Sequence, residues 1–368
     1  MKKYRKILPA ILCLALLSGC ARQTELSQEQ RLLARCEEIA AACEGLGQRT
    51  VDEMEEALEE AGFDVMDSSE ACPAYLTTAD RFRDFWERVQ QEAPAEQEVI
   101  SIDGAGALDY RLFSYQDGTA YVFNMRYPLD GIGGRYWEAH EILDWELTDR
   151  GNFYYQVYPA DRHYPDYTLI RLEPPDLELW ELNEKYVMSG GYIATNLFLT
   201  DWTEEDFGTL SFNDAWEDLY FDYYGQAFYP DGYAEAGPHR YQLPAEKFET
   251  VMLSYFRVDL ETLRELAHYQ AEGDYYPWRQ VQTNDFGFLA YEMIEPEVTA
   301  YRVNGDGTLT LTVELLSTDQ KLDCLFAHEV TVRPLEDGGF QFVGNRVTSQ
   351  TELGLPFCEP RLTWDGGA

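Results

Sequence analysis

The chain has 368 residues, of which 67 are acidic and 28 basic, and its formal net charge is −39. This charge excludes a nucleic-acid-binding protein, because such proteins neutralise phosphates with lysine and arginine, and it argues against a folded body that lies on anionic lipid. The hydrophobic content of 45% excludes a disordered acidic tail, and the length predicts about two domains.

The first residues have the composition of a secretory signal, which we expect over residues 1–19. The segment MKKYRK carries four basic residues, and ILPAILCLALL follows as an apolar run of eleven. This run is shorter than the about 20 residues that a membrane-spanning helix needs, and it has the length and flanks of a signal peptide.

Residues Leu17 to Cys20, at the end of this run, read LSGC, which resembles the lipobox of bacterial lipoproteins. The resemblance implies that Cys20 carries a diacylglyceryl thioether and that cleavage before it makes Cys20 the new N-terminus. Two acyl chains on one residue give stable anchoring. We therefore expect a protein held at the cell membrane through its lipid, facing outside the cytoplasm, with residues 20–26 as a tether. The alternative is an ordinary signal peptide with a cysteine near its end.

Residues 27–172 are expected to form an N-terminal α+β lobe. Helical spacing of apolar residues predicts three helices, and a capping box of Thr50 and Glu53 opens the second. The period then changes to two, and close turns between the segments predict antiparallel hairpins. The expected helices are 27–45, 50–62 and 78–92, and the expected strands are 99–103, 109–115, 119–127, 137–147, 153–158 and 167–172.

The rest of the chain is divided into a connecting region, 173–240, with a helix over 213–224, and a C-terminal α+β lobe, 241–368. In this lobe, too, a helical stretch precedes hairpin-like strands. The predicted fold class is therefore α+β, with two tandem lobes that each have N-terminal helices followed by an antiparallel sheet of hairpins. This order of elements resembles cystatin-like or NTF2-like lobes, an analogy of architecture that does not fix a function.

Five cysteines follow Cys20, and this odd number leaves at least one thiol outside any bond within the chain. If the first two helices fold back on each other, the end of the second returns near the middle of the first. A bond between Cys36 and Cys72 is then the first disulfide to test. The pairing of the others stays open; they are Cys43, Cys324 and Cys358.

The sequence contains an internal similarity. AHEILDWELTDRG at 139–151 and AHEVTVRPLEDGG at 327–339 share six of thirteen positions at an offset of 188, and DGT recurs upstream at 117–119 and 306–308. The offset changes by one residue only where a loop is expected, and loops tolerate insertions. We interpret the similarity as divergent duplication, with coincidence as the alternative.

The histidine–glutamate pairs in these two segments do not indicate a metal site. A zinc-protease motif needs a helix with a second histidine four residues after the first, and those positions hold Asp144 and Val332. Alternation with period two also turns each glutamate to the opposite face from its histidine. We therefore expect His140 and His328 to be half-buried structural residues with a local hydrogen bond, and we expect no metal, cofactor or catalytic residue.

Two further patterns have a structural and a binding interpretation. Helical spacing of Trp216, Leu219, Tyr220 and Tyr223 is typical of a core face, although aromatic side chains can also stack on sugars. The Tyr-, Asp- and Gly-rich segment 221–241 is the best candidate for an exposed aromatic surface. NGDGTLTLT at 304–312 lacks the ligand spacing of a calcium loop, so a tight hairpin turn is expected.

The phrases TNLFLTDW, FNDAWEDLY and AHEVTVRPLEDGGFQFVGNRV resemble Gram-positive surface lipoproteins of no assigned function. With the lipobox, they favour a non-catalytic binding or interaction module near the membrane, whose ligand or protein partner the sequence does not name. Two alternatives stay open. One is the solute-binding lipoprotein of a transporter, which should have alternating strands and helices with parallel sheets. The other is an extracellular hydrolase that acts on glycans or peptides.

Overall fold

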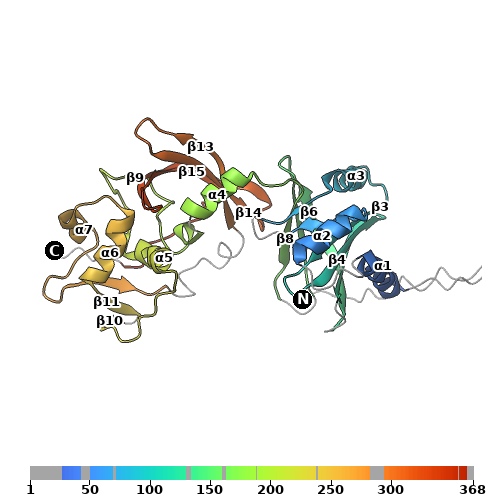
Figure 1. Cartoon of the computed structure of the whole chain (residues 1–368), viewed down its shortest axis with the longest axis horizontal. Helices are drawn as coiled ribbons and strands as arrows, with labels where there is room; N and C mark the ends of the chain where they lie inside the picture. Colours follow the sequence, from blue (N-terminus) through green and yellow to red (C-terminus); the bar gives the residue numbers. More distant parts are fainter. Residues whose placement is uncertain are drawn as a thin grey trace, which may run out of the picture.

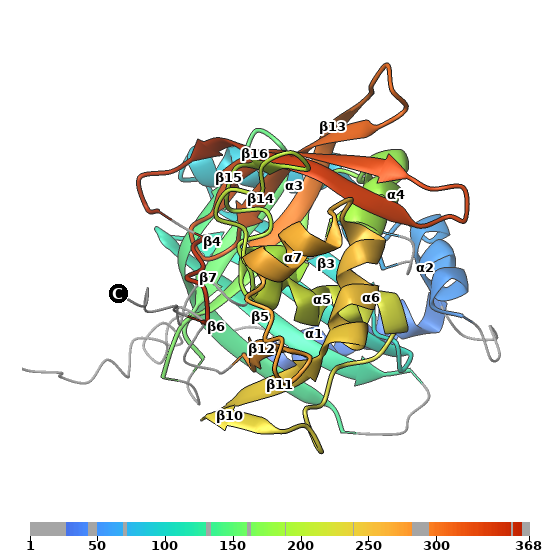
Figure 2. The same cartoon turned by 90° about the vertical axis from the view of Figure 1, so that its left-hand side faces the viewer.

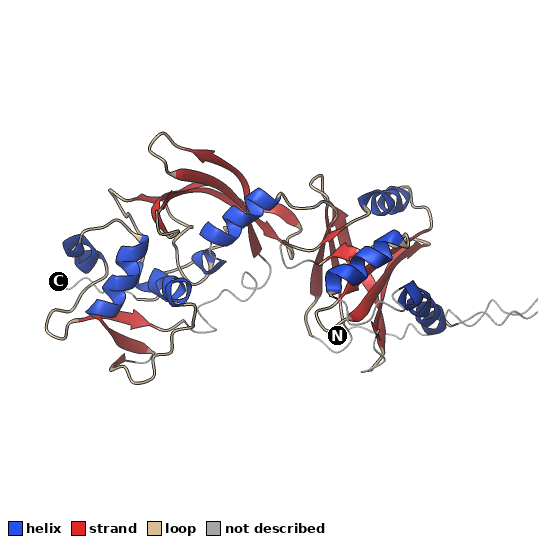
Figure 3. Cartoon of the chain, in the orientation of Figure 1, coloured by secondary structure: helices blue, strands red, loops and turns tan. Residues whose placement is uncertain are grey.

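The structure, a computed structural model, describes residues 27–42, 50–68, 72–129, 134–159, 163–187, 189–237, 239–281, 294–354 and 356–362. Within these residues the chain is a mixed α+β protein with large antiparallel sheets (Figures 1 and 3). Its α-helices are α1 (Gln28–Ala42), α2 (Val51–Glu60), α3 (Ala79–Gln90), α4 (Leu177–Tyr186), α5 (Phe212–Tyr224), α6 (Ala245–Tyr255) and α7 (Leu260–Leu266).

The first 172 residues contribute an eight-stranded sheet with the order β1-β2-β8-β7-β6-β5-β4-β3. Its neighbouring long strands pair antiparallel, as close hairpin turns require. The strands are β1 (Met66–Asp67), β2 (Tyr75–Leu76), β3 (Ala95–Ile102), β4 (Ala107–Gln116), β5 (Thr119–Pro128), β6 (Tyr136–Leu147), β7 (Asn152–Val157) and β8 (Asp166–Arg171).

The two ends of this strand order meet. Val65, next to β1, forms a parallel bridge with Ile100 of β3, and the Ile100 amide donates to the Asp64 carbonyl at 2.9 Å. The sheet is therefore nearly closed into a barrel-like form.

Side chains on the two faces of this sheet pack against different helices. On one face, Phe82 of α3 lies in a core cluster with Val99 and Phe113. On the other face, Cys36 of α1 lies in a second cluster with Ile100 and other residues. Because Val99 and Ile100 are consecutive in β3, their side chains point to opposite faces, and both are fully buried.

Residues beyond 172 contribute two further sheets. The five-stranded sheet has the order β13-β14-β15-β16-β9, and the three-stranded sheet has the order β10-β11-β12. Figure 2 shows α5 and α6 between these two sheets; α6 contacts both of them, and α5 contacts α6 and the three-stranded sheet through β12. The strands are β9 (Trp202–Thr203), β10 (Glu235–Gly237), β11 (Arg240–Pro244), β12 (Tyr275–Arg279), β13 (Ile294–Val303), β14 (Leu309–Ser317), β15 (Leu322–Pro334) and β16 (Phe340–Gln350).

The segment expected to be a connecting region contributes to the core of this part of the molecule. Trp216 and Phe212 of α5 are fully buried and belong to the same hydrophobic cluster as Phe342 of β16. The domain bounds themselves remain predictions. The packing shows, however, that segment 173–240 shares one core with the strands that follow it, because its aromatic side chains fill the space between the sheets.

The long predicted elements are confirmed. The first three helices and the six strands up to residue 172 all form, with ends within a few residues of the expected ones. The capping box is also present, with Thr50 Oγ1 accepting from the Glu53 amide and the Glu53 side chain accepting from the Thr50 amide.

The expected disulfide between Cys36 and Cys72 does not form, because both residues carry free thiols. Cys36 is fully buried between α1 and the sheet, where it packs as a small apolar side chain with Leu32 and Ile39. Cys43 lies outside the described residues.

A pocket between two sheets

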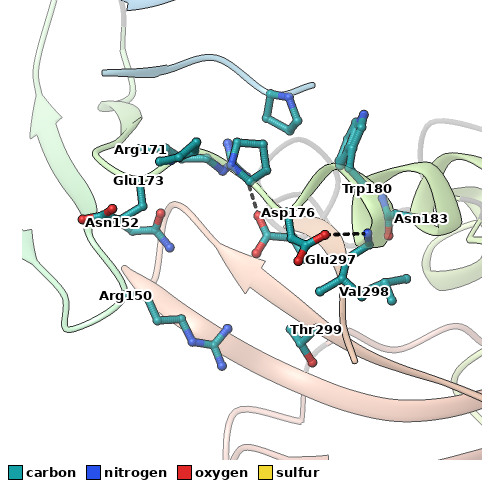
Figure 4. Close-up of a pocket in the computed structure, with 14 residues that line it drawn as sticks. Arg150, Asn152, Arg171, Glu173, Asp176, Trp180, Asn183, Glu297, Val298 and Thr299 are labelled. Carbon is teal, nitrogen blue, oxygen red and sulfur yellow. Dashed lines mark hydrogen bonds and ion pairs between the residues drawn. The ribbon is translucent and has the colours of Figure 1, made fainter. Parts of the chain in front are cut away.

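A pocket of about 490 Å³ lies where the eight-stranded sheet meets α4 and β13 (Figure 4). We call it the junction pocket. Its walls come from segments more than 100 residues apart, which the fold brings together. The lining residues are Pro73, Arg150, Asn152, Arg171, Glu173, Pro174, Pro175, Asp176, Leu179, Trp180, Asn183, Glu297, Val298 and Thr299.

An arginine at the end of β8 joins one wall to the other. Arg171 Nη2 lies 2.7 Å from Glu295 Oε2 and 2.7 Å from Glu297 Oε1, and both glutamates belong to β13. The Arg171 side chain is only 13% exposed, so its charge is balanced largely within the protein rather than by water.

A second set of contacts links β7 and its preceding turn to β14 and β15. Arg150 pairs with Glu314, and Asp323 Oδ1 accepts from the side-chain Nδ2 of Asn152 at 2.8 Å and from the Tyr154 hydroxyl at 3.0 Å. Tyr154 is fully buried. Burial raises the pKa of its phenol well above the usual range, and the nearby Asp323 carboxylate raises it further. The hydroxyl therefore stays protonated and donates a hydrogen bond to Asp323.

Helix α4 supplies the remaining wall. It begins after Pro174-Pro175, and the Asp176 side chain caps it by accepting from the amides of Glu178 and Leu179. Trp180 and Asn183 are three residues apart on this helix, so they lie side by side at the pocket (Figure 4). Asn183 is 5% exposed, and its Oδ1 has no hydrogen-bond partner among the residues that the structure describes. An unsatisfied buried amide oxygen costs about 1–3 kcal/mol, and few native groups stay in this state without a reason.

The two histidines of the repeated segments lie in different sheets and form no common site. His140 Nε2 lies 3.0 Å from Glu138 Oε2 on β6, and its side chain is 11% exposed. Glu141 is exposed while Ile142 is buried, which confirms the predicted alternation of faces. Across the described residues, no group of three or more His, Cys, Asp or Glu side chains is placed to hold a metal ion.

His328 is fully buried rather than half-buried, and its hydrogen bonds are not local. Its Nδ1 lies 2.6 Å from Asn345 Oδ1 and its Nε2 lies 2.7 Å from the Tyr192 hydroxyl. Since Asn345 Nδ2 donates to two backbone carbonyls, its Oδ1 is the acceptor, and the His328 proton lies on Nδ1. Burial lowers the pKa of His328 to about 4, against a smaller opposing effect of Asn345. This neutral histidine is a structural residue.

The aromatic stripe of α5 is mainly core, as predicted, since Trp216, Leu219 and Tyr220 are buried. Tyr223, the fourth member of the stripe, is 45% exposed, and Tyr229 of the following segment is 73% exposed. The predicted exposed aromatic surface is thus present in part. Beside it, the Lys247 ammonium lies over three aromatic rings, 5.5 Å from the ring centres of Tyr220 and Tyr233 and 5.8 Å from that of Phe228.

Cys20, the residue to which the sequence assigns lipidation, lies outside the described residues, as do the signal segment and the whole of the tether. None of the helices that the structure describes has the length and apolar content to cross a membrane.

Sequence reasoning did not single out any residue of the junction pocket. The signal that could have indicated its α4 wall is Pro174-Pro175-Asp176, where a capping aspartate follows two prolines and precedes an amphipathic segment. The meeting of this helix with β13 has no local signal.

Comparisons with known proteins add one finding. No curated protein and no solved structure matches the chain. Residues 24–361 match a family described as a family of unknown function, DUF6070. Since this match covers almost the whole chain, including every residue of the junction pocket, the protein belongs to the DUF6070 family.

Proposed function

We propose that the protein is a lipid-anchored, extracytoplasmic binding protein that holds a ligand in the junction pocket and performs no reaction on it. The observation that carries the proposal is the pocket, in which a buried amide oxygen of Asn183 lacks a partner in the described part of the chain. Its volume of about 490 Å³ lies within the range of about 300–1,000 Å³ that is typical of small-molecule sites. The LSGC motif at Leu17 to Cys20 supports the anchor.

We also propose that the chain consists of two tandem lobes derived by duplication, with a cystatin-like or NTF2-like order of elements. The repeated DGT segments occupy the β4–β5 and β13–β14 turns, and the repeated AHE segments lie in β6 and β15. The meanders β4-β5-β6-β7 and β13-β14-β15-β16 also have the same strand order. These correspondences support a common origin.

The sheet topology does not favour the solute-binding lipoprotein of a transporter. Such a protein should have parallel sheets built from alternating strands and helices. Among the described strands, the neighbouring pairs within each sheet are antiparallel, apart from the single pair of β2 with β8. An extracellular hydrolase remains the weaker alternative, and turnover of a broad panel of wall polymers would establish it.

The anchor is tested by replacing Cys20 with alanine. We expect Cys20→Ala to abolish incorporation of radiolabelled palmitate and to release the protein from membranes, because the thioether has no other attachment point. Cys13→Ala, inside the signal segment, is the matched control and should be labelled and processed normally. Normal membrane binding and processing of Cys20→Ala would contradict the proposal.

Binding is tested by a thermal-shift survey of the chain from Glu25 onward against sugars, peptides, calcium, small solutes and wall fragments. A ligand present at about 100 times its Kd should stabilise the fold by about 2.7 kcal/mol. Loss of the shift in a variant of the junction pocket would locate the site. A survey in which no compound raises the unfolding temperature would overturn the binding proposal.

A further inference from the structure

We infer that the junction pocket takes a neutral, hydroxyl-bearing ring, such as a hexose unit, that packs on Trp180 and donates a hydrogen bond to Asn183. This inference rests on the proposed binding function and specifies its ligand class.

The charged side chains around the pocket already have partners within the protein, which disfavours a charged ligand. Arg171 is paired with Glu295 and Glu297, and Arg150 is paired with Glu314. Of the remaining carboxylates in the wall, Glu173 is paired with Arg83 and Asp176 caps the N-terminus of α4. A cationic or anionic ligand would therefore have to lose water and compete with these existing partners for the charged side chains.

The polar group that lacks a partner is an acceptor. Asn183 Oδ1 accepts no hydrogen bond within the described residues, and the side chain is 5% exposed at the pocket wall. Asn183 lines the pocket, and rotation about the broad, roughly two-fold χ2 torsion of asparagine changes the direction in which this oxygen points. Sugar hydroxyls are neutral donors that can satisfy it. A ligand without a donor would leave the oxygen unsatisfied.

The aromatic group at the same wall suits the apolar face of a sugar ring. Trp180 is partly exposed and lines the pocket one helical turn from Asn183 (Figure 4). Beside these two residues, Val298 and Thr299 of β13 add an apolar side chain and a hydroxyl. An aromatic face next to a few placed polar groups is the usual composition of a site for a small polar ring.

The test uses the full chain in detergent and isothermal titration calorimetry with sugars matched in shape. The neutral probes are the methyl glycosides of glucose, galactose and N-acetylglucosamine. Their charged counterparts are the methyl glycosides of glucosamine, galactosamine, glucuronate and galacturonate. We expect at least one neutral glycoside to bind at least tenfold more tightly than its charged counterparts.

Two substitutions locate the site. Trp180→Ala should weaken binding at least tenfold, whereas Trp137→Ala, at an exposed tryptophan of β6 outside the pocket, should leave it unchanged.

Asn183→Leu should also weaken binding at least tenfold, yet raise the unfolding temperature by a few degrees, because it removes an unsatisfied buried oxygen. Asn213→Leu is the stability control. It deletes satisfied hydrogen bonds to Ala267 and Pro277, so it should lower that temperature.

The outcomes separate this inference from the proposed function. Tighter binding of a charged glycoside, or neutral binding that persists in both pocket variants, would overturn the inference. Binding of none of the three neutral glycosides would overturn it as well. In each case the proposed binding function is supported if another compound of the thermal-shift survey stabilises the protein and Trp180→Ala abolishes that stabilisation. The binding function is contradicted if no compound has this effect.

Discussion

At the scale of single residues, His328 shows how a polar side chain is accommodated in the core of β15. The imidazole is fully buried, with a hydrogen bond at each ring nitrogen, from Nδ1 to Asn345 and from Tyr192 to Nε2. Each satisfied bond lowers the cost of burying a polar group, and the fixed ring orientation connects β15, β16 and the segment around Tyr192. Protonation would place a charge where no carboxylate compensates for it among these bonded partners.

This burial predicts a pH dependence of stability. The pKa of His328 falls to about 4 in the folded protein, while the unfolded value is about 6.5, so only the unfolded chain binds the proton between these values. Stability is therefore unaffected by this residue above pH 6.5 and decreases as the pH falls from 6.5 to 4, by about 3 kcal/mol in all. Urea unfolding across this range should show a steeper decrease for the wild type than for His328→Gln. Equal slopes in the two proteins would show that the histidine is not buried as a neutral group.

At the scale of elements, long periodic segments could be predicted from the sequence and short ones could not. Strands β3 to β8 each span at least six residues, and their apolar pattern is visible locally in the sequence. Strand β9 has two residues and pairs with β16, so it exists because the tertiary fold places it there. The same holds for β1 and β2.

The junction pocket could not be predicted for a related reason. Its wall at β8 and its wall at β13 are about 125 residues apart, and the contact between Arg171 and Glu295 depends on how whole sheets meet. In an acidic chain, no sequence pattern selects the glutamates that pair with a given arginine. By contrast, the core role of Trp216 on α5 could be predicted, because helical spacing alone indicates its face.

The packing of α1 predicts a reactivity difference between thiols. Burial raises the pKa of Cys36 to about 12, so its thiol stays protonated and shielded in the folded protein. Iodoacetamide at pH 8 should modify the partly exposed Cys72 rapidly and Cys36 only when α1 leaves the sheet, with mass spectrometry as the readout. Leu32→Ala should speed the modification of Cys36, because it removes a buried contact on the same face of α1. Modification of both thiols at the same rate in the native protein would contradict this packing.

At the scale of the whole molecule, the contacts between the eight-stranded sheet and the five-stranded sheet are largely polar. They include the two glutamate partners of Arg171 and a pair between Lys321 and Asp144. Polar contacts of this kind resemble those between domains that move relative to each other, more than those of a continuous apolar core. The junction pocket lies on this boundary, so a ligand there touches both sides.

Asp323 is the residue whose loss should loosen this boundary most selectively. Asp323→Ala removes the acceptor of Asn152 and of the buried Tyr154 hydroxyl, and each unsatisfied donor costs about 1–3 kcal/mol. Hydrogen–deuterium exchange should therefore become faster in peptides that cover β7 and β15. Asp337→Ala, in the exposed β15–β16 turn, is the matched control and should leave the exchange of β7 unchanged. Unaltered exchange of β7 in Asp323→Ala would show that Asp323 does not stabilise the contact between the eight-stranded and five-stranded sheets.

The near closure of the eight-stranded sheet has a consequence for crowding at a surface. Unpaired backbone groups along the outer strand of a sheet can recruit a strand from a neighbouring molecule and start aggregation. Here the amide of Ile100, well inside β3, is already bonded to the Asp64 carbonyl, and α2 and α3 pack beside the strand. Copies that stand close together are therefore not expected to pair their eight-stranded sheets through β3.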